Sequence, residues 1–519
     1  MAPPALPPVD KIDPARAWQP WQPSAADPWG PKWAGHLYRR AAFGGNLTEL
    51  RRAVAAGHTA TIDLLMKGEP KAAGLYPSLT QWGREFSKEI GNLRGWWVYF
   101  MLNGGHPLRE RMTLFWHNHF ATSVAKVTSV PLMYKQNVLL RQHALGKFEP
   151  FLQAMSKDPA MLRWLDSNSN IKGRANENYA REVMELFSLG VHSGYTEKDI
   201  REAARAFTGW GTNGDDYEFN AYFHDTGTKT ILGRTGNFNG EDIVRIVLQR
   251  PVTARFLVRK LYRNFLSEQH DPPDALIEPL ADSFRKSDYD VAQLMRTMLS
   301  SRHFFSDYAF RQRIKSPVEY VLGSVRAVYR AYPEKDPNYS KLPIPMLVSR
   351  IDAMGQPLFA PPNVKGWRGA EAWLTTSTLL ARQNFAQAVA MGTLWPRQPA
   401  QAPLSTRAAQ VALAEAEAQR AQDAKKPKPK APAPPTKPEE DPPAKAFDPA
   451  RVIGEEKVTK PEEVVRLLLD VYLPGGVSPA AQTKLIAFVA KGNPAGRDLE
   501  RRAREAVQAI LGMPESQLA

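Results

Sequence analysis

Along most of the chain, hydrophobic residues recur every three to four positions, the spacing that places them on one face of an α-helix. The pattern covers about 34–205, about 241–334, 461–473, 479–491 and 497–511. Local signals agree with it: Thr196 stands three residues before Asp199, which predicts a capped helix start, and Gly190 predicts a helix end. The sequence therefore predicts a mainly α, multi-helix globular protein.

Three stretches interrupt this pattern. Residues 211–240 alternate and are rich in Gly, Asn and Asp, which predicts a small β-hairpin with strands at 217–223 and 229–232 that turns at HDTGT. The stretch MGQPLFAPPNVKGW, 354–367, holds too much Pro and Gly for a helix. Residues 425–445, KKPKPKAPAPPTKPEEDPPAK, are typical of a stiff, solvated linker.

These interruptions divide the chain into four predicted segments. They are a Pro/Trp-rich extended arm at 1–33, a helical core domain at 34–400 with the hairpin near 215–235, a polar helix and Pro/Lys-rich linker at 401–450, and C-terminal helices at 451–519 that pack on the core. The prolines argue against a helix in the arm. The linker has almost no apolar side chain to bury, so we expect proteases to cut there first.

Composition narrows the chemistry. The 519 residues contain no cysteine, so disulfides and thiolate metal sites are excluded, and any metal must use His, Asp, Glu or backbone oxygen. The net charge of +15 favours anionic partners such as acidic polysaccharide, nucleic acid or an anionic membrane, although it is equally compatible with solubility alone. No sequence-specific nucleic-acid module and no transmembrane run is visible. The N-terminus is not a signal peptide: either the protein is not exported by that route, or a signal was removed and Met1 added.

The stretch FWHNHFATSVAKV, 115–127, holds a pair of histidines. On a helix, His117 and His119 lie about 200° apart, so they converge only if the helix ends near Asn118. One interpretation is a reactive or metal-binding pair. The other is that one histidine is a hydrogen-bonded core residue and the second sits at a helix end.

A second candidate is the helix predicted at 176–190. Glu177, Arg181 and Glu185 stack at i, i+4 and i+8, with Asn178 and Glu182 beside them. One interpretation is a solvated face with i,i+4 ion pairs. The other is an acidic cleft wall, where Arg181 keeps one carboxylate ionised while another stays protonated.

Two loops add weaker candidates. His224 and Asp225 stand on a Gly-rich turn, which suits a metal site or a proton relay, although Asp also simply favours turns. Trp367 ends the loop PPNVKGW and is a candidate stacking platform for a sugar, or a core residue.

Together, many of these stretches resemble one family. They are HLYRRAAFGG (36–45), FWHNHFATS (115–123), QN with RQHALGKF (136–148), DPAMLRWLDSNSN (158–170), NENYAREVMELFSLG (176–190), YTEKDIREAARAFTGW (195–210), HDTGTKTILG (224–233), IKSPVEYVLG (314–323), MGQPLFAPPNVKGW and RAREAVQAILGMPESQ (502–517). In this order they resemble the large bacterial family called domain of unknown function 1800, over 36–395 and 451–517. The resemblance implies a bacterial protein of the kind that is often exported to the periplasm and encoded beside proteins resembling sulfatases. It implies no established reaction.

The first functional hypothesis is an envelope hydrolase or lyase that acts on an acidic glycan. The candidate catalytic residues are Glu177, Glu182, Glu185, Arg181 and His117; the candidate substrate-binding residues are Asn118, Asn176, Asn178 and Trp367; the candidate ligands of a divalent metal ion are His119, His224 and Asp225. We expect at least one histidine of the pair to lie one hydrogen bond or metal bridge away from a carboxylate of 176–189, with His224–Asp225 near the same cleft. The second hypothesis is a non-enzymatic binding or assembly protein in which these groups are structural. Candidate partners are an anionic polysaccharide or a sulfatase-like protein.

Overall fold

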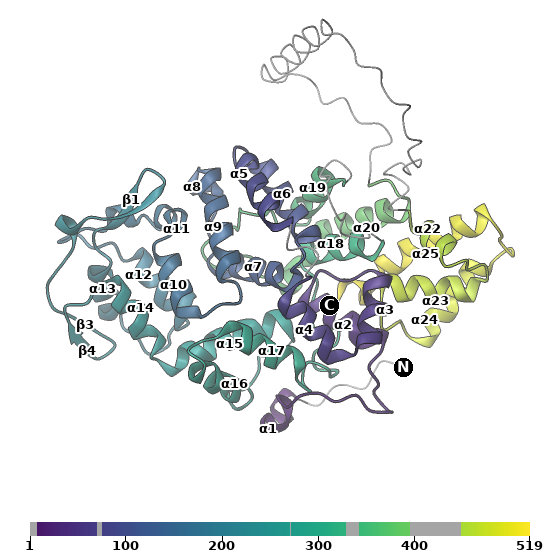
Figure 1. Ribbon diagram of the computed structural model, residues 1–519, viewed down its shortest axis with the longest axis horizontal. Helices are drawn as coiled ribbons and strands as arrows, with labels where there is room; N and C mark the ends of the chain where they lie inside the picture. Colours follow the sequence, from purple (N-terminus) through teal and green to yellow (C-terminus); the bar gives the residue numbers. More distant parts are fainter. Residues whose placement is uncertain (1–7, 70–74, 270, 329–341, 395–447) are drawn as a thin grey trace, which may run out of the picture.

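A computed structural model of the chain describes residues 8–69, 75–269, 271–328, 342–394 and 448–519. It is built almost entirely of α-helices (Figure 1), which confirms the predicted class. Before the strands come α1 (Pro14–Ala17), α2 (Pro31–Ala41), α3 (Leu47–Ala56), α4 (His58–Lys67), α5 (Leu75–Phe86), α6 (Ile90–Asn103), α7 (Pro107–His119), α8 (Val124–Val127), α9 (Val130–His143), α10 (Phe148–Ser156), α11 (Pro159–Trp164), α12 (Asn178–Glu182) with a π-helical turn η4 (Val183–Ser188), and α13 (Glu197–Ala206).

After the strands come α14 (Gly240–Leu248), α15 (Pro251–Phe265), α16 (Asp274–Lys286), α17 (Val291–Ser300), α18 (Pro317–Val328), α19 (Ile344–Ala353), α20 (Thr376–Ala390), α22 (Pro449–Glu455), α23 (Pro461–Tyr472), α24 (Pro479–Ala490), α25 (Arg497–Gly512) and α26 (Pro514–Gln517). Short 3₁₀ turns are η1 (Val9–Lys11), η3 (Ser167–Ser169), η5 (Ala221–Phe223) and η7 (Ala370–Trp373). Within the described residues, no helix is both long and apolar enough to cross a membrane.

Local sequence signals set many of the helix starts. The Thr196 side chain accepts a hydrogen bond from the Asp199 backbone, and Asp199 bonds back to Thr196, which confirms the predicted cap of α13. Asn46 and Asn239 form equivalent capping boxes on α3 and α14. Proline in the first turn begins α2, α7 and α15, where its missing N–H leaves no helical bond unmade.

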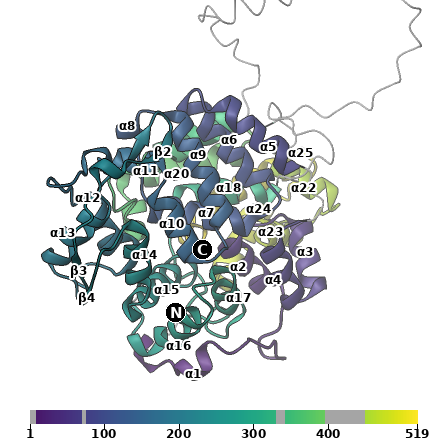
Figure 2. The same cartoon turned by 60° about the vertical axis from the view of Figure 1, so that its left-hand side comes forward.

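Helix α7 lies between two hydrophobic cores. Its Trp116 belongs to a core formed with α2, α10 and α13 to α17, whereas its Leu114 belongs to a second core formed with α6, α18, α20 and α23 to α25. Figures 1 and 2 show α7 in the middle of the molecule from both directions. Most side chains at the end of α7 are therefore buried, and Asn118 is partly exposed.

The β region differs from the predicted single hairpin. Strand β1 (Trp210–Asn213) pairs with β2 (Asp216–Phe219), and β3 (Lys229–Ile231) pairs with β4 (Arg234–Gly236), both antiparallel. The predicted pairing of 217–223 with 229–232 is therefore wrong. Each strand finds a nearer partner across a two-residue turn, and the second turn, Leu232–Gly233, has positive φ at both positions, as hairpin turns prefer.

The described part of the N-terminal arm is not simply extended. It contains η1 and the one-turn helix α1, which lies against α16. Trp18 is buried and donates a hydrogen bond to the Leu276 carbonyl at 2.7 Å. The arm folds back because its tryptophans bury large apolar surfaces in the first core.

The C-terminal helices α23, α24 and α25 match the predicted 461–473, 479–491 and 497–511 to within one residue. Helix α25 packs against α20, and α23 packs against α18. Tyr320 donates to the Leu511 carbonyl at 3.0 Å, and Arg382 donates to the Gln517 side chain at 3.1 Å. The predicted polar helix and linker at 401–450 lie outside the described residues, except for 448–450 at the start of α22.

The packing of α25 and α23 leads to a prediction about cleavage. If the chain is cut once at a protease site inserted between 401 and 447, we expect the two fragments to remain together, because α25 and α23 bury apolar faces against the core. Gel filtration without denaturant measures this. Separation of the fragments would show that 451–519 is an independent domain.

Candidate functional site

The two histidines of FWHNHF are buried at the end of α7 and point to different neighbours. The Phe359 N–H donates to His117 Nε2 at 3.1 Å. His119 Nε2 lies 3.2 Å from the carbonyl oxygen of Phe187, in the π-helical turn η4. Burial lowers the pKa of His117 to about 3, and it lowers the pKa of His119 well below its ordinary value, with Lys260 adding to the effect.

This arrangement corrects the expected contact with the acidic helix. His119 does reach the segment 176–189, but through a backbone carbonyl, and within the described residues neither imidazole hydrogen-bonds Glu177, Glu182 or Glu185. The reason is helical geometry: α7 continues to His119, so the two rings leave the helix in different directions. The neighbouring Trp116 packs edge-on to His119 and stacks near Phe148, as core residues do.

The polar face of 176–189 is a half-exposed ion-pair cluster. Arg181 lies 3.0 Å from Glu177, 3.4 Å from Glu185 and 2.8 Å from Glu197 of α13. The two pairs within the helix contribute only ~0.2–0.5 kcal/mol each in such a position. The arrangement fits the interpretation of a solvated helix face with ion pairs better than that of an acidic cleft wall.

Glu182 is the exception in this helix. Its Oε2 is buried and has no hydrogen-bond partner among the described residues. Burial raises the pKa of Glu182 to about 6, and the Glu185 carboxylate adds to the rise, while Arg181 and Lys365 oppose it. Glu182 is therefore the one carboxylate of the predicted group that combines an unused buried oxygen with a pKa near neutrality.

The remaining candidates of this region are held by local bonds. The Asn176 amide donates to the Ser169 hydroxyl at 2.8 Å, and its oxygen accepts from the Asn178 N–H at 2.9 Å, so Asn176 shapes the turn before α12. The side chain of Asn178 is exposed. Neither residue lines the cavity beside Trp367.

His224 and Asp225 belong to a separate cluster. Arg205 of α13 donates two hydrogen bonds to Asp225, at 2.8 and 3.1 Å, and holds the pKa of that carboxyl down at about 2. His224 Nδ1 lies 2.8 Å from the Thr208 carbonyl. Arg205 stands eight residues after Glu197, so this cluster lies about 12 Å along α13 from the Arg181 cluster.

The donor set does not fit the metal site proposed for His119, His224 and Asp225. His119 is bonded to Phe187 near α7, and Asp225 is taken by Arg205. In the part of the chain that the structure describes, no three His, Asp or Glu side chains come together in a way that could hold a metal ion.

Asn118 and Trp367, two of the predicted binding residues, do come together. The Trp367 N–H donates to Asn118 Oδ1 at 2.7 Å, and Asn118 Nδ2 donates to the Trp367 carbonyl at 3.3 Å. This pair of bonds fixes the loop 354–369 against the end of α7. Trp367 is mostly buried, with 6% of its surface exposed, and packs near the His117 ring.

A cavity of about 330 Å³ opens beside this contact. Side chains of α7, α15, α18 and the loop line it, and they are mainly cationic. The charged lining residues are Arg111, Lys260, Arg263, Arg313, Lys365, Arg368, Glu268 and Glu319. Six positive side chains therefore face two carboxylates, and Trp367, Trp373 and Phe115 supply aromatic wall.

The two carboxylates do not neutralise this cavity. Glu319 is buried and already contacts Arg111 at 2.5 Å and Arg313 at 2.9 Å. Lys260, Lys365 and Arg368 make no ion pair within the described residues. Burial lowers the pKa of Lys260 to about 7, which places its amine near the midpoint of protonation at neutral pH.

The cavity residues were missed because they are scattered along the sequence. The local signals were weak: Lys260, Arg263 and Asn264 are spaced for one helix face, and Lys365 and Arg368 flank Gly366–Trp367. Only folding brings these basic positions next to Arg111 and Arg313.

The loop contact leads to a second prediction, for Gly366→Ala. Gly366 has φ +76°, and a Cβ there would lie 2.1 Å from Asn118 Oδ1. We expect the variant to lose the two Asn118–Trp367 bonds and about 2–3 kcal/mol of unfolding free energy. Urea unfolding measures the loss.

The matched control for this variant is Gly355→Ala, in the same loop. Gly355 also has a positive φ, +94°, but a Cβ there would meet nothing within 4 Å. It should show only the backbone cost of a positive φ, about 1 kcal/mol. Equal losses in both variants would mean that the contact with Asn118 does not hold the loop.

Comparison with known proteins places this architecture in a family. Residues 36–518 match the family described as a protein of unknown function, DUF1800. The chain belongs to the DUF1800 family. No curated protein and no solved structure matches it. The DUF1800 match includes α7, α15, α18 and the loop 354–369, so every wall of the cationic cavity lies within the family region.

Proposed function

We propose that this DUF1800 protein binds an anionic ligand in the cationic cavity, and that the ligand is an acidic sugar. The observation that carries the proposal is the excess of positive charge: Lys260, Lys365 and Arg368 line the cavity and make no ion pair within the described residues. Lys260 is partly buried, whereas Lys365 and Arg368 are exposed, so a ligand that supplies carboxylates can form charge-assisted hydrogen bonds with all three.

The size and walls of the cavity support a sugar rather than a bare ion. A volume of about 330 Å³ falls at the lower end of small-molecule sites, which suits one or two sugar rings. Trp367 and Trp373 offer aromatic surface on which a ring can pack, and Asn264 and Gln356 offer hydrogen bonds for hydroxyl groups.

Binding experiments test this proposal. Calorimetric titration with a hexuronate disaccharide should give saturable binding, whereas the matching neutral disaccharide should bind at least tenfold more weakly, a loss of about 1.4 kcal/mol or more. Lys260→Met and Arg368→Met should each weaken uronate binding by at least about tenfold. Arg497→Met, at an exposed position outside the cavity, is the control. Equal affinity for charged and neutral sugars would overturn the proposal.

A second candidate function is cleavage of the bound glycan. The observation that favours it is that Lys260 and Glu182 have pKa values of about 7 and about 6, which suit proton transfer near neutral pH. In a lyase, the neutral Lys260 amine would remove the proton on the carbon beside the uronate carboxylate while the C4–O bond breaks, and water would protonate the departing oxygen. In a hydrolase, Glu182 would pass its proton through one water to the leaving oxygen, while a second water attacks the anomeric carbon. Glu177, Glu185, Arg181 and His117 have no direct role in this version of the proposal.

Two product assays separate the candidates. Elimination forms a C4–C5 double bond that absorbs ultraviolet light, whereas hydrolysis forms only new reducing ends. If uronate binds tightly and neither product forms, the result favours a binding protein. Glu182→Gln should abolish hydrolysis and leave uronate affinity unchanged, because Glu182 does not line the cavity.

A further inference from the structure

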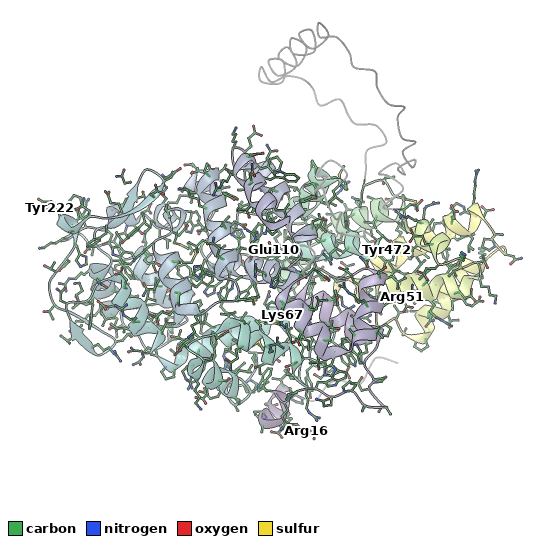
Figure 3. The ribbon with its side chains drawn as sticks, in the orientation of Figure 1. Arg16, Arg51, Lys67, Glu110, Tyr222 and Tyr472 are labelled. Atoms are coloured by element: carbon green, nitrogen blue, oxygen red, sulfur yellow. The ribbon has the colours of Figure 1, made fainter. Side chains whose placement is uncertain are left out.

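A second, smaller cavity of about 40 Å³ lies where the C-terminal helices meet the core. It is lined by Arg39 of α2, Glu319 and Ser324 of α18, Tyr472 of α23, and Lys315. Figure 3 labels Tyr472 at this junction, toward the C-terminal helices and away from Tyr222 at the opposite end of the molecule. The sugar site proposed above does not include this cavity.

Two buried side chains that line this cavity keep unused hydrogen-bond donors. Arg39 is 8% exposed and donates from Nη1 to the Pro474 carbonyl at 3.1 Å, but its Nε and Nη2 have no partner within the described residues. The Tyr472 hydroxyl, on a side chain that is 7% exposed, also has no partner there. Buried donors are normally satisfied, so three unused donors beside one cavity call for an acceptor.

The charge at this cavity is also uncompensated. Lys315 donates to the Ser516 carbonyl at 2.8 Å, a neutral acceptor. Glu319 lines the cavity, but its carboxylate is already shared by Arg111 and Arg313. Burial lowers the pKa of Lys315 to about 7, and the nearby charges of Arg39 and Arg311 add to this effect. Among the described side chains that line the cavity, the positive groups thus have no free negative partner.

We propose that this cavity binds a small inorganic anion of the size of chloride or bromide. A space of about 40 Å³ exceeds what one water needs but is too small for a sugar or another organic acid. The Arg39 guanidinium, the Lys315 ammonium and the Tyr472 hydroxyl are the ligands. Because they come from α2, from the segment before α18 and from α23, the anion joins the C-terminal helices to the core.

Thermal unfolding in matched salts tests this proposal. The full chain is dialysed into sodium gluconate and titrated with sodium bromide at constant ionic strength. We expect the melting temperature to rise by about 2 °C and to saturate, as binding to the folded state requires. Crystals grown in bromide should show an anomalous peak between Arg39 and Tyr472. A melting temperature that does not respond to bromide would overturn the proposal.

Variants identify the site. Tyr472→Phe keeps the packing and removes one donor, so it should need several-fold more bromide for the same shift. Arg39→Met should abolish the shift, and Lys491→Met, at an exposed position of the C-terminal region, should leave it unchanged. A bromide effect that Tyr472→Phe and Arg39→Met leave intact would place the ion elsewhere. Ala519 also lines the cavity. If its carboxyl group supplies the negative charge instead, bromide will stabilise only a chain extended beyond Ala519, and that result would overturn the proposal. Uronate binding is measured separately and does not depend on these outcomes.

Discussion

Lowering the pH from 7 to about 4.5 is expected to unfold this protein, because the free energy of unfolding of a folded protein is only ~5–15 kcal/mol. Five histidines have lowered pKa values: the buried His36, His117, His119 and His303, and the partly buried His106. Burial is the first cause in each of them. The unfolded chain takes up protons on these side chains below about pH 6.5, whereas the folded chain does not.

Because the unfolded chain binds more protons, lowering the pH decreases the free energy of unfolding. Stability is fully present above about pH 6.5 and is lost as the pH falls through the range between the unfolded and folded pKa values. Each histidine can remove about 1.4 kcal/mol per pH unit in that range. For His117 the range extends down to about 3, and for His303 down to about 4. Urea unfolding followed by circular dichroism between pH 7 and pH 5 measures the slope.

His117→Gln isolates one contribution. Glutamine Oε1 can accept the Phe359 N–H in place of His117 Nε2, and it cannot take up a proton in this range. We expect the slope of stability against pH to become shallower by about one proton. His192→Gln, at an exposed position, should leave the slope unchanged. Equal slopes for the His117→Gln variant and the unaltered protein would show that His117 is protonated in the folded state.

The helices could be predicted from the sequence because their signals are local. The cap formed by Thr196 and Asp199 lies within four residues, and the apolar spacing of 497–511 is visible without knowing what α25 packs against. The strand pairing was predicted wrongly because the sequence holds two turn signals close to the same strands. The observed β1–β2 turn is Gly214–Asp215, a local hairpin signal, whereas the predicted turn was HDTGT.

The site was predicted only in part, for a related reason. The carboxylate face of 176–189 is a pattern within one helix, so it was visible in the sequence, but its ion pairs leave it half exposed. The cationic cavity draws on Arg111, Lys260, Arg313 and Lys365, which are separated by up to about 250 residues. No sequence spacing connects such positions, so an excess of positive charge around one cavity becomes visible only in the three-dimensional structure. Asn118 and Trp367 were the two predicted residues that reached this cavity.

Glu319→Gln is expected to cost about 3–5 kcal/mol of unfolding free energy. Glu319 is 5% exposed and stands between the two cavities. Burial alone would raise the pKa of Glu319, but the guanidinium groups of Arg111 and Arg313 hold it well below its usual range. Glutamine fills the same space without the charge, so two buried arginines lose their shared counter-charge.

A double variant tests this cause. Glu85→Gln, at an exposed position with no ion pair within the described residues, should change stability by less than about 0.5 kcal/mol. If uncompensated charge is what destabilises Glu319→Gln, adding Arg313→Met removes one of the two stranded cations and should recover part of the loss, so the two effects will not add. Losses that simply add would mean that Glu319 acts through its hydrogen bond from the Ser316 N–H, which is 2.7 Å long, rather than through its charge.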